Sequence, residues 1–429
     1  MRISKQLQSI KKIPRTLVAL IASIAAALFF ILPALTQQPV TIKVLIQALE
    51  AEQLQPIVEE FEKQNPDINL DIIEAPNETN QVEDLYTSAF LLGESPYDLV
   101  YMDIVWVPKF AAAGWLMPLS DRVSQEELEQ FLNGDVNGGT YEGELYRMPF
   151  RSDVGMLYYR TDWLKQAGYK PPETFDDLVQ ISQDLQSRDT VEWGYLWQGK
   201  QYEGLSAMFV EILEGFGGFW VDPDTLKVGL DQPEAIQGAE FLRSLIKKNI
   251  SPPGITTYAE PATHRLFING ESVFLRNWPY VYGLALDSPI EGEFAIKEMP
   301  HSRQGSSGAS QGGWGLGISA NTKHPEEAWR VVEFLSKAET QKEYSLRTGY
   351  LPSRRALYTN PELVAKYPYF PELLKVIENS VLRPPIAQYS QTSDILQRYL
   401  SAALTGTMSP EEAMNTAARE TRAVLEQSK

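Results

Sequence analysis

The sequence predicts an α/β protein with two domains. The chain has 429 residues, 43% of them hydrophobic. The roughly 390 residues that follow the N-terminal segment exceed what one hydrophobic core usually supports. Strand-like and helix-like segments alternate near the start and again in a later region, which is typical of parallel sheets with helices on their faces.

The N-terminal segment indicates export. Its five basic residues precede an apolar stretch over 17–35 and are Arg2, Lys5, Lys11, Lys12 and Arg15. Positive charge followed by an apolar run is the pattern of an export signal. The run is close to the ~20 residues that span a bilayer, and Ala34 to Gln37 form a poor cleavage site. Residues 1–38 are therefore a cleaved signal peptide or an uncleaved membrane anchor, and both place the rest of the chain outside the cytoplasm, in the periplasm of a two-membrane cell.

The first domain begins with alternating elements. Apolar spacing predicts, in order, a strand at 41–46, a helix at 51–64, a strand at 68–73, a helix at about 80–92 and a strand at 98–102. Ligands of open α/β sheets bind beyond the carboxyl ends of the strands. Glu50 and Asp103 lie just beyond two of these ends, which makes both candidates for a binding site.

The later region predicts a second α/β domain. Thr174 resembles the cap of a helix that continues over 178–186, and 233–248 is an amphipathic helix. We expect loops rich in Trp and Gly over 193–220. Helices with Pro in the first turn follow at 325–335 and after Ser409. Because no flexible linker separates the regions, we expect several chain crossings between the two domains.

Composition excludes several classes of function. The chain has no cysteine and three histidines, and His264, His301 and His324 are not at metal-ligand spacing. We therefore expect no disulfide, metal site, cofactor or Ser-His-Asp hydrolase. Beyond residue 38 the sequence has 33 basic and 56 acidic residues, and this net negative charge repels nucleic acid and anionic lipid. Neutral or cationic ligands are favoured.

Six segments carry a family resemblance. They are 98–119 (DLVYMDIVWVPKFAAAGWLMPL), 156–162 (MLYYRTD), 197–205 (WQGKQYEGL), 267–280 (FINGESVFLRNWPY), 312–319 (GGWGLGIS) and 349–354 (GYLPSR). In this order they resemble family 1 bacterial extracellular solute-binding proteins of ABC sugar importers, and among these the trehalose- and maltose-binding branch. The similarity runs from about residue 41 to the C-terminus.

The resemblance implies a two-lobe periplasmic-binding-protein fold, or Venus flytrap, with a mainly parallel sheet in each lobe. Lobe I would hold 39–151 and about 300–336, and lobe II 152–299 and about 337–429. The hinge crossings are expected near Arg151, 299–302 and Ser336. The lobes would close over a ligand and present it to the membrane permease, with the ATPase involved only indirectly. We expect a monomer.

A sugar offers hydroxyls at its rim and C–H faces above and below the ring, so its site needs charged or amide groups together with aromatic planes. The resemblance and the placement of residues predict nine ligand-binding residues: Glu50, Asp103, Arg151, Asp153, Trp278, Gly313, Trp314, Arg383 and Tyr389.

The charged candidates each have a structural alternative. Glu50 could be a solvated acid in a helix first turn, with Glu52 binding in its place. Asp103 could cap the following helix while also binding ligand. Arg151 and Asp153 could form a hinge ion pair, and the family often has an aromatic residue where Arg151 stands.

The aromatic candidates and those near the C-terminus also have structural alternatives. Trp278 and Tyr389 could be core residues, and Arg383 could be exposed. Trp314 is flanked by Gly312, Gly313 and Gly315, and glycines let backbone approach a ligand closely. The shared motif with Trp197, Gln198 and Tyr202 fits loop packing as well as ligand contact.

The predicted function is capture of a disaccharide-like sugar such as trehalose, maltose, sucrose or glucosylglycerol, without catalysis. One alternative is binding of another small solute such as a polyamine. A glycosidase using Glu50, Asp103 and Asp153 would need two carboxyls at a defined separation. A role in feeding a chemoreceptor would share the same fold and pocket.

Overall fold

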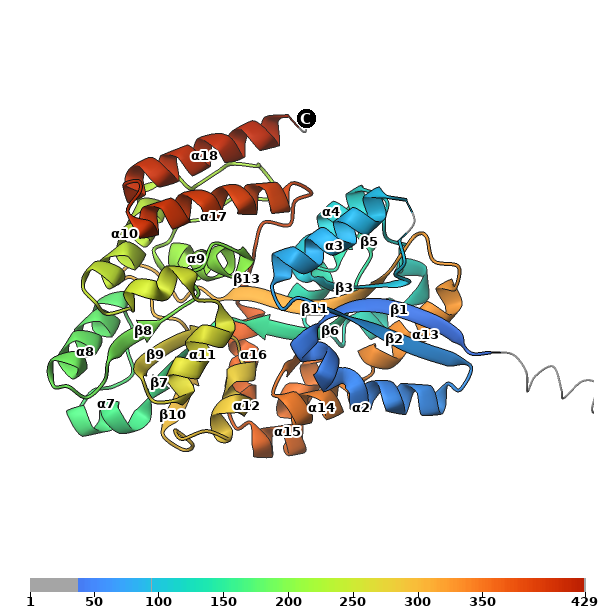
Figure 1. Cartoon of the computed structure of the whole chain (residues 1–429), viewed down its shortest axis with the longest axis horizontal. Coiled ribbons are helices and arrows are strands. Elements are labelled where there is room, and N and C mark those ends of the chain that lie inside the picture. Colours follow the sequence, from blue (N-terminus) through green and yellow to red (C-terminus); the bar gives the residue numbers. More distant parts are fainter. Residues whose placement is uncertain (1–37, 94, 428–429) are drawn as a thin grey trace, which may run out of the picture.

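The computed structural model describes residues 38–93 and 95–427. Two separate sheets, each flanked by helices, form the two halves of the molecule (Figure 1). The predicted export segment, 1–38, lies outside the described residues except for its last position. Within the described residues, no helix is long and apolar enough to cross a membrane.

The larger sheet has seven strands in the order β12-β6-β11-β3-β1-β2, and β13 pairs with β11. Their bounds are β1 (Val40–Gln47), β2 (Ile68–Ala75), β3 (Leu99–Asp103), β6 (Met148–Val154), β11 (Ser310–Ile318), β12 (Leu351–Pro352) and β13 (Val381–Leu382). The first three strands are parallel, as predicted. However, β11 runs antiparallel to both β3 and β6, because it enters from the other half of the molecule without a crossover helix. The sheet is therefore mixed and not mainly parallel.

The smaller sheet is also mixed. Its order is β10-β7-β9-β8, with β7 (Met156–Arg160), β8 (Trp193–Leu196), β9 (Ser272–Asn277) and β10 (Phe294–Lys297). Strand β7 is antiparallel to both of its neighbours, and only β8 and β9 are parallel. A separate two-stranded sheet joins β4 (Thr140–Tyr141) and β5 (Glu144–Leu145).

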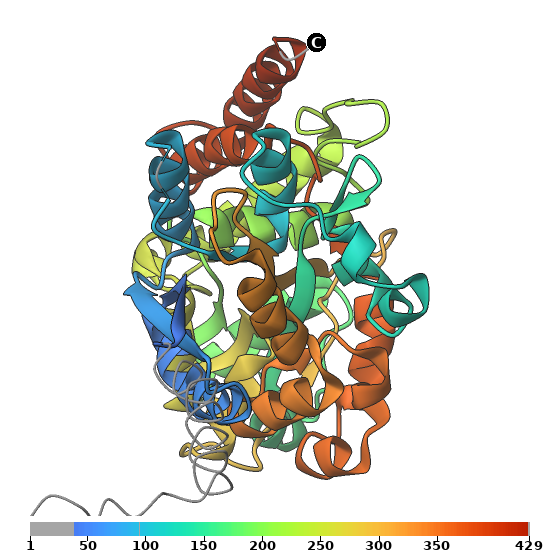
Figure 2. The ribbon, with the colours of Figure 1, turned by 90° about the vertical axis from the view of Figure 1, so that its right-hand side faces the viewer.

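The helices cover the faces of the two sheets. They are α2 (Ala48–Gln64), α3 (Thr79–Leu91), α4 (Val107–Ala112), α5 (Gln125–Leu128), α6 (Asn133–Asn137), α7 (Thr161–Ala167), α8 (Phe175–Ser187), α9 (Glu203–Gly215), α10 (Pro233–Lys247), α11 (Glu260–Ile268), α12 (Tyr280–Leu286), α13 (Pro325–Ser336), α14 (Ala338–Thr348), α15 (Pro361–Lys366), α16 (Phe370–Glu378), α17 (Tyr389–Thr405) and α18 (Pro410–Glu426). Helices α17 and α18 lie together at one end of the molecule in both views (Figures 1 and 2).

Several predicted helix starts are confirmed. Thr174 forms a complete capping box with Asp177 at the start of α8, and the Ser409 side chain caps α18. The prediction of loops over 193–220 was wrong, since this segment contains β8 and α9. Nearly all residues of α9 are buried, and a helix buried on every side lacks the polar stripe that reveals helical spacing.

Three connections join the two halves. They are Gly155 between β6 and β7, 298–309 between β10 and β11, and 383–388 between β13 and α17. The first two are close to the predicted crossings, but the third is far from Ser336. Strands β12 and β13 pair within the larger sheet and α14 packs on α2. Most of 338–382 therefore lies with the first half, contrary to the predicted lobe II.

Candidate functional site

A cavity of about 450 Å³ lies between the two halves. We call it the front cavity. Eight of the nine predicted site residues line it, and they are Glu50, Asp103, Arg151, Asp153, Trp278, Gly313, Trp314 and Arg383. Tyr389 does not line it. The carboxyl ends of β1 and β3 and the first turns of α9 and α11 meet at this cavity, so polar groups gather where strands end and helices begin.

Arg151 is held by carboxylates from two elements. Its Nε donates to Glu50 Oε1 at 2.7 Å and its Nη2 donates to Glu50 Oε2 at 3.0 Å, while Nη1 donates to Asp153. The hydroxyls of Tyr101 and Tyr344 also donate to Glu50 Oε1, at 2.5 and 3.0 Å. Both oxygens of Glu50 are therefore engaged from within the protein. Glu50 is buried and not the solvated acid of the alternative interpretation, and its arrangement fixes Arg151.

One carboxylate oxygen of Asp153 accepts a hydrogen bond from Arg151, and the other has no donor from the protein. Its Oδ1 is buried without a hydrogen-bond partner among the described residues. Burial raises the pKa of Asp153 to about 6, although the nearby charge of Arg151 opposes the rise. The side chain thus keeps one acceptor without a protein partner, and protonation can change it near neutral pH.

Arg383 joins both halves of the molecule. Its Nη2 donates to Asp103 Oδ1 at 2.8 Å and its Nη1 donates to Glu203 Oε1 at 2.6 Å. Asp103 ends β3 and also accepts from the Val105 backbone at 3.3 Å, so its capping role coexists with the ion pair. Arg383 is buried, not exposed as in the alternative interpretation. Arg383 lines the cavity, and its Nε is a buried donor without a partner among the described residues.

Tyr389 stands behind the cavity. Its hydroxyl donates to Glu203, and Ser393 donates to the other Glu203 oxygen at 2.6 Å. Burial raises the pKa of Glu203, which Arg383 counteracts. Tyr389 therefore orients a cavity residue from the first turn of α17, which explains its place outside the lining.

Trp278 is supported from behind by a buried ion pair. Arg276 lies over its ring, 4.1 Å from the ring centroid. Arg276 Nε donates to Glu211 Oε2 at 2.7 Å, and both side chains are 0% exposed. At its edge, Trp278 Nε1 donates to Glu260 Oε1 at 3.2 Å, and Tyr202 donates to Glu260 Oε2 at 2.5 Å. The ring is half-buried, fixed on one side and placed in the cavity wall.

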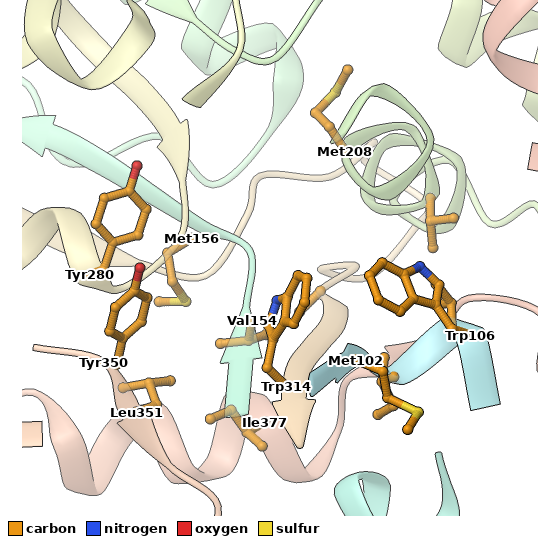
Figure 3. Packing of buried hydrophobic residues seen from close by; sticks show 14 of the residues in the cluster. Met102, Trp106, Val154, Met156, Met208, Tyr280, Trp314, Tyr350, Leu351 and Ile377 are labelled. Carbon is orange, nitrogen blue, oxygen red and sulfur yellow. The ribbon is translucent and has the colours of Figure 1, made fainter. Parts of the chain in front are cut away.

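Trp314 belongs to both the core and the cavity wall. It is 6% exposed, and its ring centroid lies 5.1 Å from that of Tyr101 and 5.3 Å from that of Trp106. Figure 3 shows Trp314 and Trp106 in this cluster. The flanking glycines also have a role in the packing of the sheet. A Cβ on Gly315 would lie 2.3 Å from the Met148 carbonyl oxygen, and Gly313 has φ +140°. These glycines let β6 approach β11 closely at the register shift beside Trp314.

Further residues of the wall were missed or left unassigned from the sequence. Glu203 and Glu260 open α9 and α11, and Tyr202, Tyr350 and His264 also line the cavity. Burial lowers the pKa of His264 to about 4, so this ring is neutral at physiological pH. The usable signal was an acidic residue in the first turn of a helix, the same position that Glu50 has in α2. Tyr202 and Tyr350 lie in two of the family segments.

The arrangement is suited to binding. Among the described residues, no group of three or more potential ligands could hold a metal ion. The carboxylates and arginines are paired with one another, and aromatic rings from both halves face the same space. Tyr280 and Tyr350 approach within 5.6 Å of each other between ring centroids (Figure 3).

Comparisons with known proteins agree with this geometry. The sequence pattern of the family described as bacterial extracellular solute-binding protein matches residues 47–342. A probable ABC transporter-binding protein of Deinococcus radiodurans is 32% identical over 80% of this chain and 84% of its own. A maltotriose-binding protein of Pyrococcus abyssi is 26% identical over 74% of this chain and 67% of its own. The solved structure of maltose-bound MalE3 of T. maritima superposes with a TM-score of 0.86, at 36% identity, over 90% of this chain and 100% of that one.

Proposed function

The chain belongs to the bacterial extracellular solute-binding proteins, a family of non-enzymatic subunits of ABC transporters. From this premise we propose that it captures a neutral sugar outside the cytoplasm and delivers it to the permease. The proposed ligand has the size of a disaccharide, such as trehalose, maltose, sucrose or glucosylglycerol.

One observation carries the choice of ligand class. Asp153 and Arg383, which both line the front cavity, each keep one buried polar atom without a partner among the described residues, the acceptor Asp153 Oδ1 and the donor Arg383 Nε. A buried polar group without a partner costs about 1–3 kcal/mol. Hydroxyl groups both donate and accept, so a polyol satisfies both atoms. A polyamine is protonated and offers only donors, so it would satisfy the acceptor alone.

Size and aromatic content support the same class. Small-molecule pockets usually hold about 300–1,000 Å³, and the front cavity falls in this range with about 450 Å³. Trp278 and Trp314 supply planes for the C–H faces of sugar rings. Similarity to relatives named for maltose and maltotriose favours an α-glucoside among the candidates.

Calorimetry tests this proposal directly. The full chain is titrated with trehalose, maltose, sucrose and glucosylglycerol, and with spermidine and inorganic phosphate as charged comparators. We expect micromolar binding of at least one sugar, about −8 kcal/mol, and none of the two ions. If spermidine alone binds, the ligand is a cation and not a sugar. If no member of a broad saccharide panel binds, the proposal is refuted.

The nine-residue site can be refined in the same terms. We propose direct ligand contact for Asp103, Arg151, Asp153, Trp278, Gly313, Trp314 and Arg383, with Glu50 and Tyr389 as positioning residues. Glu260 and Tyr350 join the contact set. The hydrogen bonds that already engage Glu50 and place Tyr389 behind Glu203 support this division.

We also propose that the two halves are the lobes of a hinged clamp. One lobe would hold 39–154 and 310–382, and the other 156–297 and 389–427. The three connections between the sheets support this division. Closure over the sugar would present both lobes to the permease, and the chain would act as a monomer.

The location of the chain follows from the family and from the leader. Members of an extracellular family are exported. We propose that residues 17–35 remain uncleaved and tether the domain to the membrane, because the run is long and its exit is a poor cleavage site. A tether raises the effective concentration at the permease. Sequencing the N-terminus of the cell-derived protein decides this, since a soluble form that starts near Gln37 would exclude the tether.

A further inference from the structure

A second, larger space lies on the opposite side of the connections. It has a volume of about 760 Å³, and we call it the rear groove. One wall comes from the half that holds the larger sheet, with Asn133, Asn137 and Ile377. The other wall comes from α9 and the following loop, with Glu214 and Trp220. Like the front cavity, it is therefore formed by both halves of the molecule.

The chain segments between the two spaces face both of them. In β11, Gln311 lines the rear groove and the next residues, Gly312 to Trp314, line the front cavity. Where β13 meets the third connection, Leu382 and Pro384 line the rear groove while Arg383 lines the front cavity. These segments therefore lie between the two spaces. A rotation of the halves about them that narrows the front cavity must widen the rear groove.

The lining of the rear groove defines the chemistry of an occupant. Trp220 is 3% exposed, and its Nε1 has no hydrogen-bond partner among the described residues. Phe219 and Pro223 add apolar surface, and Asn133, Asn137 and Gln311 add amides. Arg355 is the one cationic residue of this lining within the described residues, and Glu378 pairs with it. No unpaired cation is left to attract an anion.

We propose that the rear groove is a second binding site for a small neutral polyhydroxylated molecule, and that its occupancy increases the affinity of the front cavity. Hydroxyl groups can accept from Trp220 Nε1 and donate to the carboxylates and amides, while ring C–H faces contact Phe219 and Pro223. An occupant that fits only the widened rear groove favours the arrangement in which the front cavity is closed. The front ligand then binds more tightly, and by linkage it increases the affinity of the rear groove for its occupant by the same factor. The binding part does not depend on the proposed function, whereas the coupling part rests on it.

The test separates the two sites by substitution. Trp314→Ala disables the front cavity, with Asp103→Asn as the second front variant if the first does not fold. Trp220→Phe removes the indole donor of the rear groove and keeps an aromatic ring. Trp193→Phe, in β8 and outside both linings, is the matched control. Each full-length variant is measured by thermal shift with sorbitol, myo-inositol, trehalose and maltose up to about 100 mM, because bound ligand raises Tm.

We expect the front-disabled variants to retain a Tm rise with at least one of these polyols, and the added Trp220→Phe change to abolish it. In otherwise unmodified protein, the same polyol should lower the Kd of the front sugar about fivefold or more, and Trp220→Phe but not Trp193→Phe should remove this effect. Front-disabled variants that respond to no polyol would overturn the rear site. A rear response with no change in front Kd would overturn the coupling. If no sugar binds the front cavity while polyols still raise Tm through the rear groove, only the proposed function is refuted.

Discussion

Single residues of the front cavity are fixed before a ligand arrives. Glu50 receives donors from Arg151, Tyr101 and Tyr344, and Arg151 also lies over the Tyr350 ring at 4.3 Å from its centroid. Charged side chains that are already oriented lose little freedom on binding. The ion pairs therefore serve preorganisation, and the few atoms left unpaired define what the cavity accepts.

Trp314→Ala should weaken sugar binding and stability together. Loss of its face should cost about 1–3 kcal/mol of binding. Because the ring also packs on Tyr101 and Trp106, unfolding should become easier by about 3–5 kcal/mol. Calorimetry and urea unfolding measure the two effects. Trp193→Ala, outside the cavity, should lower stability alone, and normal binding by Trp314→Ala would reassign Trp314 to the core.

Asp135 should make the stability of the protein depend on pH. This residue of α6 is fully buried, and burial raises its pKa from 3.8 to about 7, with Arg147 opposing the rise. The folded chain thus holds the proton more tightly than the unfolded chain. Its contribution to the unfolding free energy is complete below about pH 4 and is lost as the pH rises through about 7.

Wild type should therefore lose roughly 2 kcal/mol of unfolding free energy between pH 5 and pH 8 from this group. Asp135→Asn should remove that part of the loss, as measured by urea midpoints at the two pH values. Asp153, with a pKa near 6, leaves a smaller slope of the same sign. The exposed Asp189→Asn is the control and should keep the wild-type slope. An equal slope in Asp135→Asn would show that Asp135 stays ionised.

At the scale of elements, β11 depends on its glycines. The strand lies between β3 and β6, and an added Cβ at Gly317 would meet the Tyr146 carbonyl oxygen at 2.9 Å. Carbonyl oxygens of the neighbouring segment leave no room for side chains along one side of the strand. The glycine run is therefore a requirement of sheet packing, and it fixes the position of Trp314 in the cavity wall.

Gly315→Ala should destabilise the protein by about 1–3 kcal/mol or more, since its Cβ would overlap backbone that cannot move freely. Gly292→Ala is the comparison, because Gly292 has φ +75° but open space around it. There the cost should be only the ~1 kcal/mol of a left-handed conformation. Urea unfolding gives both values, and equal losses would show that the segment around Met148 moves to accommodate the added Cβ at Gly315.

The sequence allowed prediction of elements whose pattern is local. Strands β1 to β3 and helices α2, α3, α8, α10, α13 and α18 follow from apolar spacing and caps within a few residues. The two-residue strands β12 and β13 carry no such pattern, so the third crossing was placed too early. Cavity residues at strand ends, such as Asp103, were accessible in the same way. Glu203 and Glu260 are acidic residues in helix first turns, but only the tertiary fold turns those helices toward the cavity.

At the scale of the whole molecule, Arg383 connects three segments. It bridges Asp103 in one half and Glu203 in the other from within the third connection. A second link between the halves, Lys200 to Glu78 at 2.6 Å, is partly exposed. Buried pairs resist solvent screening better than exposed ones, so the Arg383 bridge should dominate the equilibrium between open and closed forms.

Glu203→Gln should shift this equilibrium toward the open form. The radius of gyration without ligand, measured by small-angle scattering, should rise, and saturating sugar should return it to a smaller value. Apparent affinity should fall in proportion to the lost closed fraction. Lys200→Met is the control and should change the unfolding free energy by less than about 1 kcal/mol. Identical scattering and affinity in Glu203→Gln would exclude a latch at this position.

The position of β11 has a consequence for how the chain reaches its destination. This strand lies between β6 and β3 in the sheet, yet residues 155–309 separate the end of β6 from the start of β11 along the chain. The larger sheet cannot assemble until that distant segment has been synthesised, and such non-local pairing slows folding. A nascent chain therefore cannot complete the larger sheet until most of its residues have been made. For a member of an exported family, this leaves the larger sheet unfinished until late in synthesis.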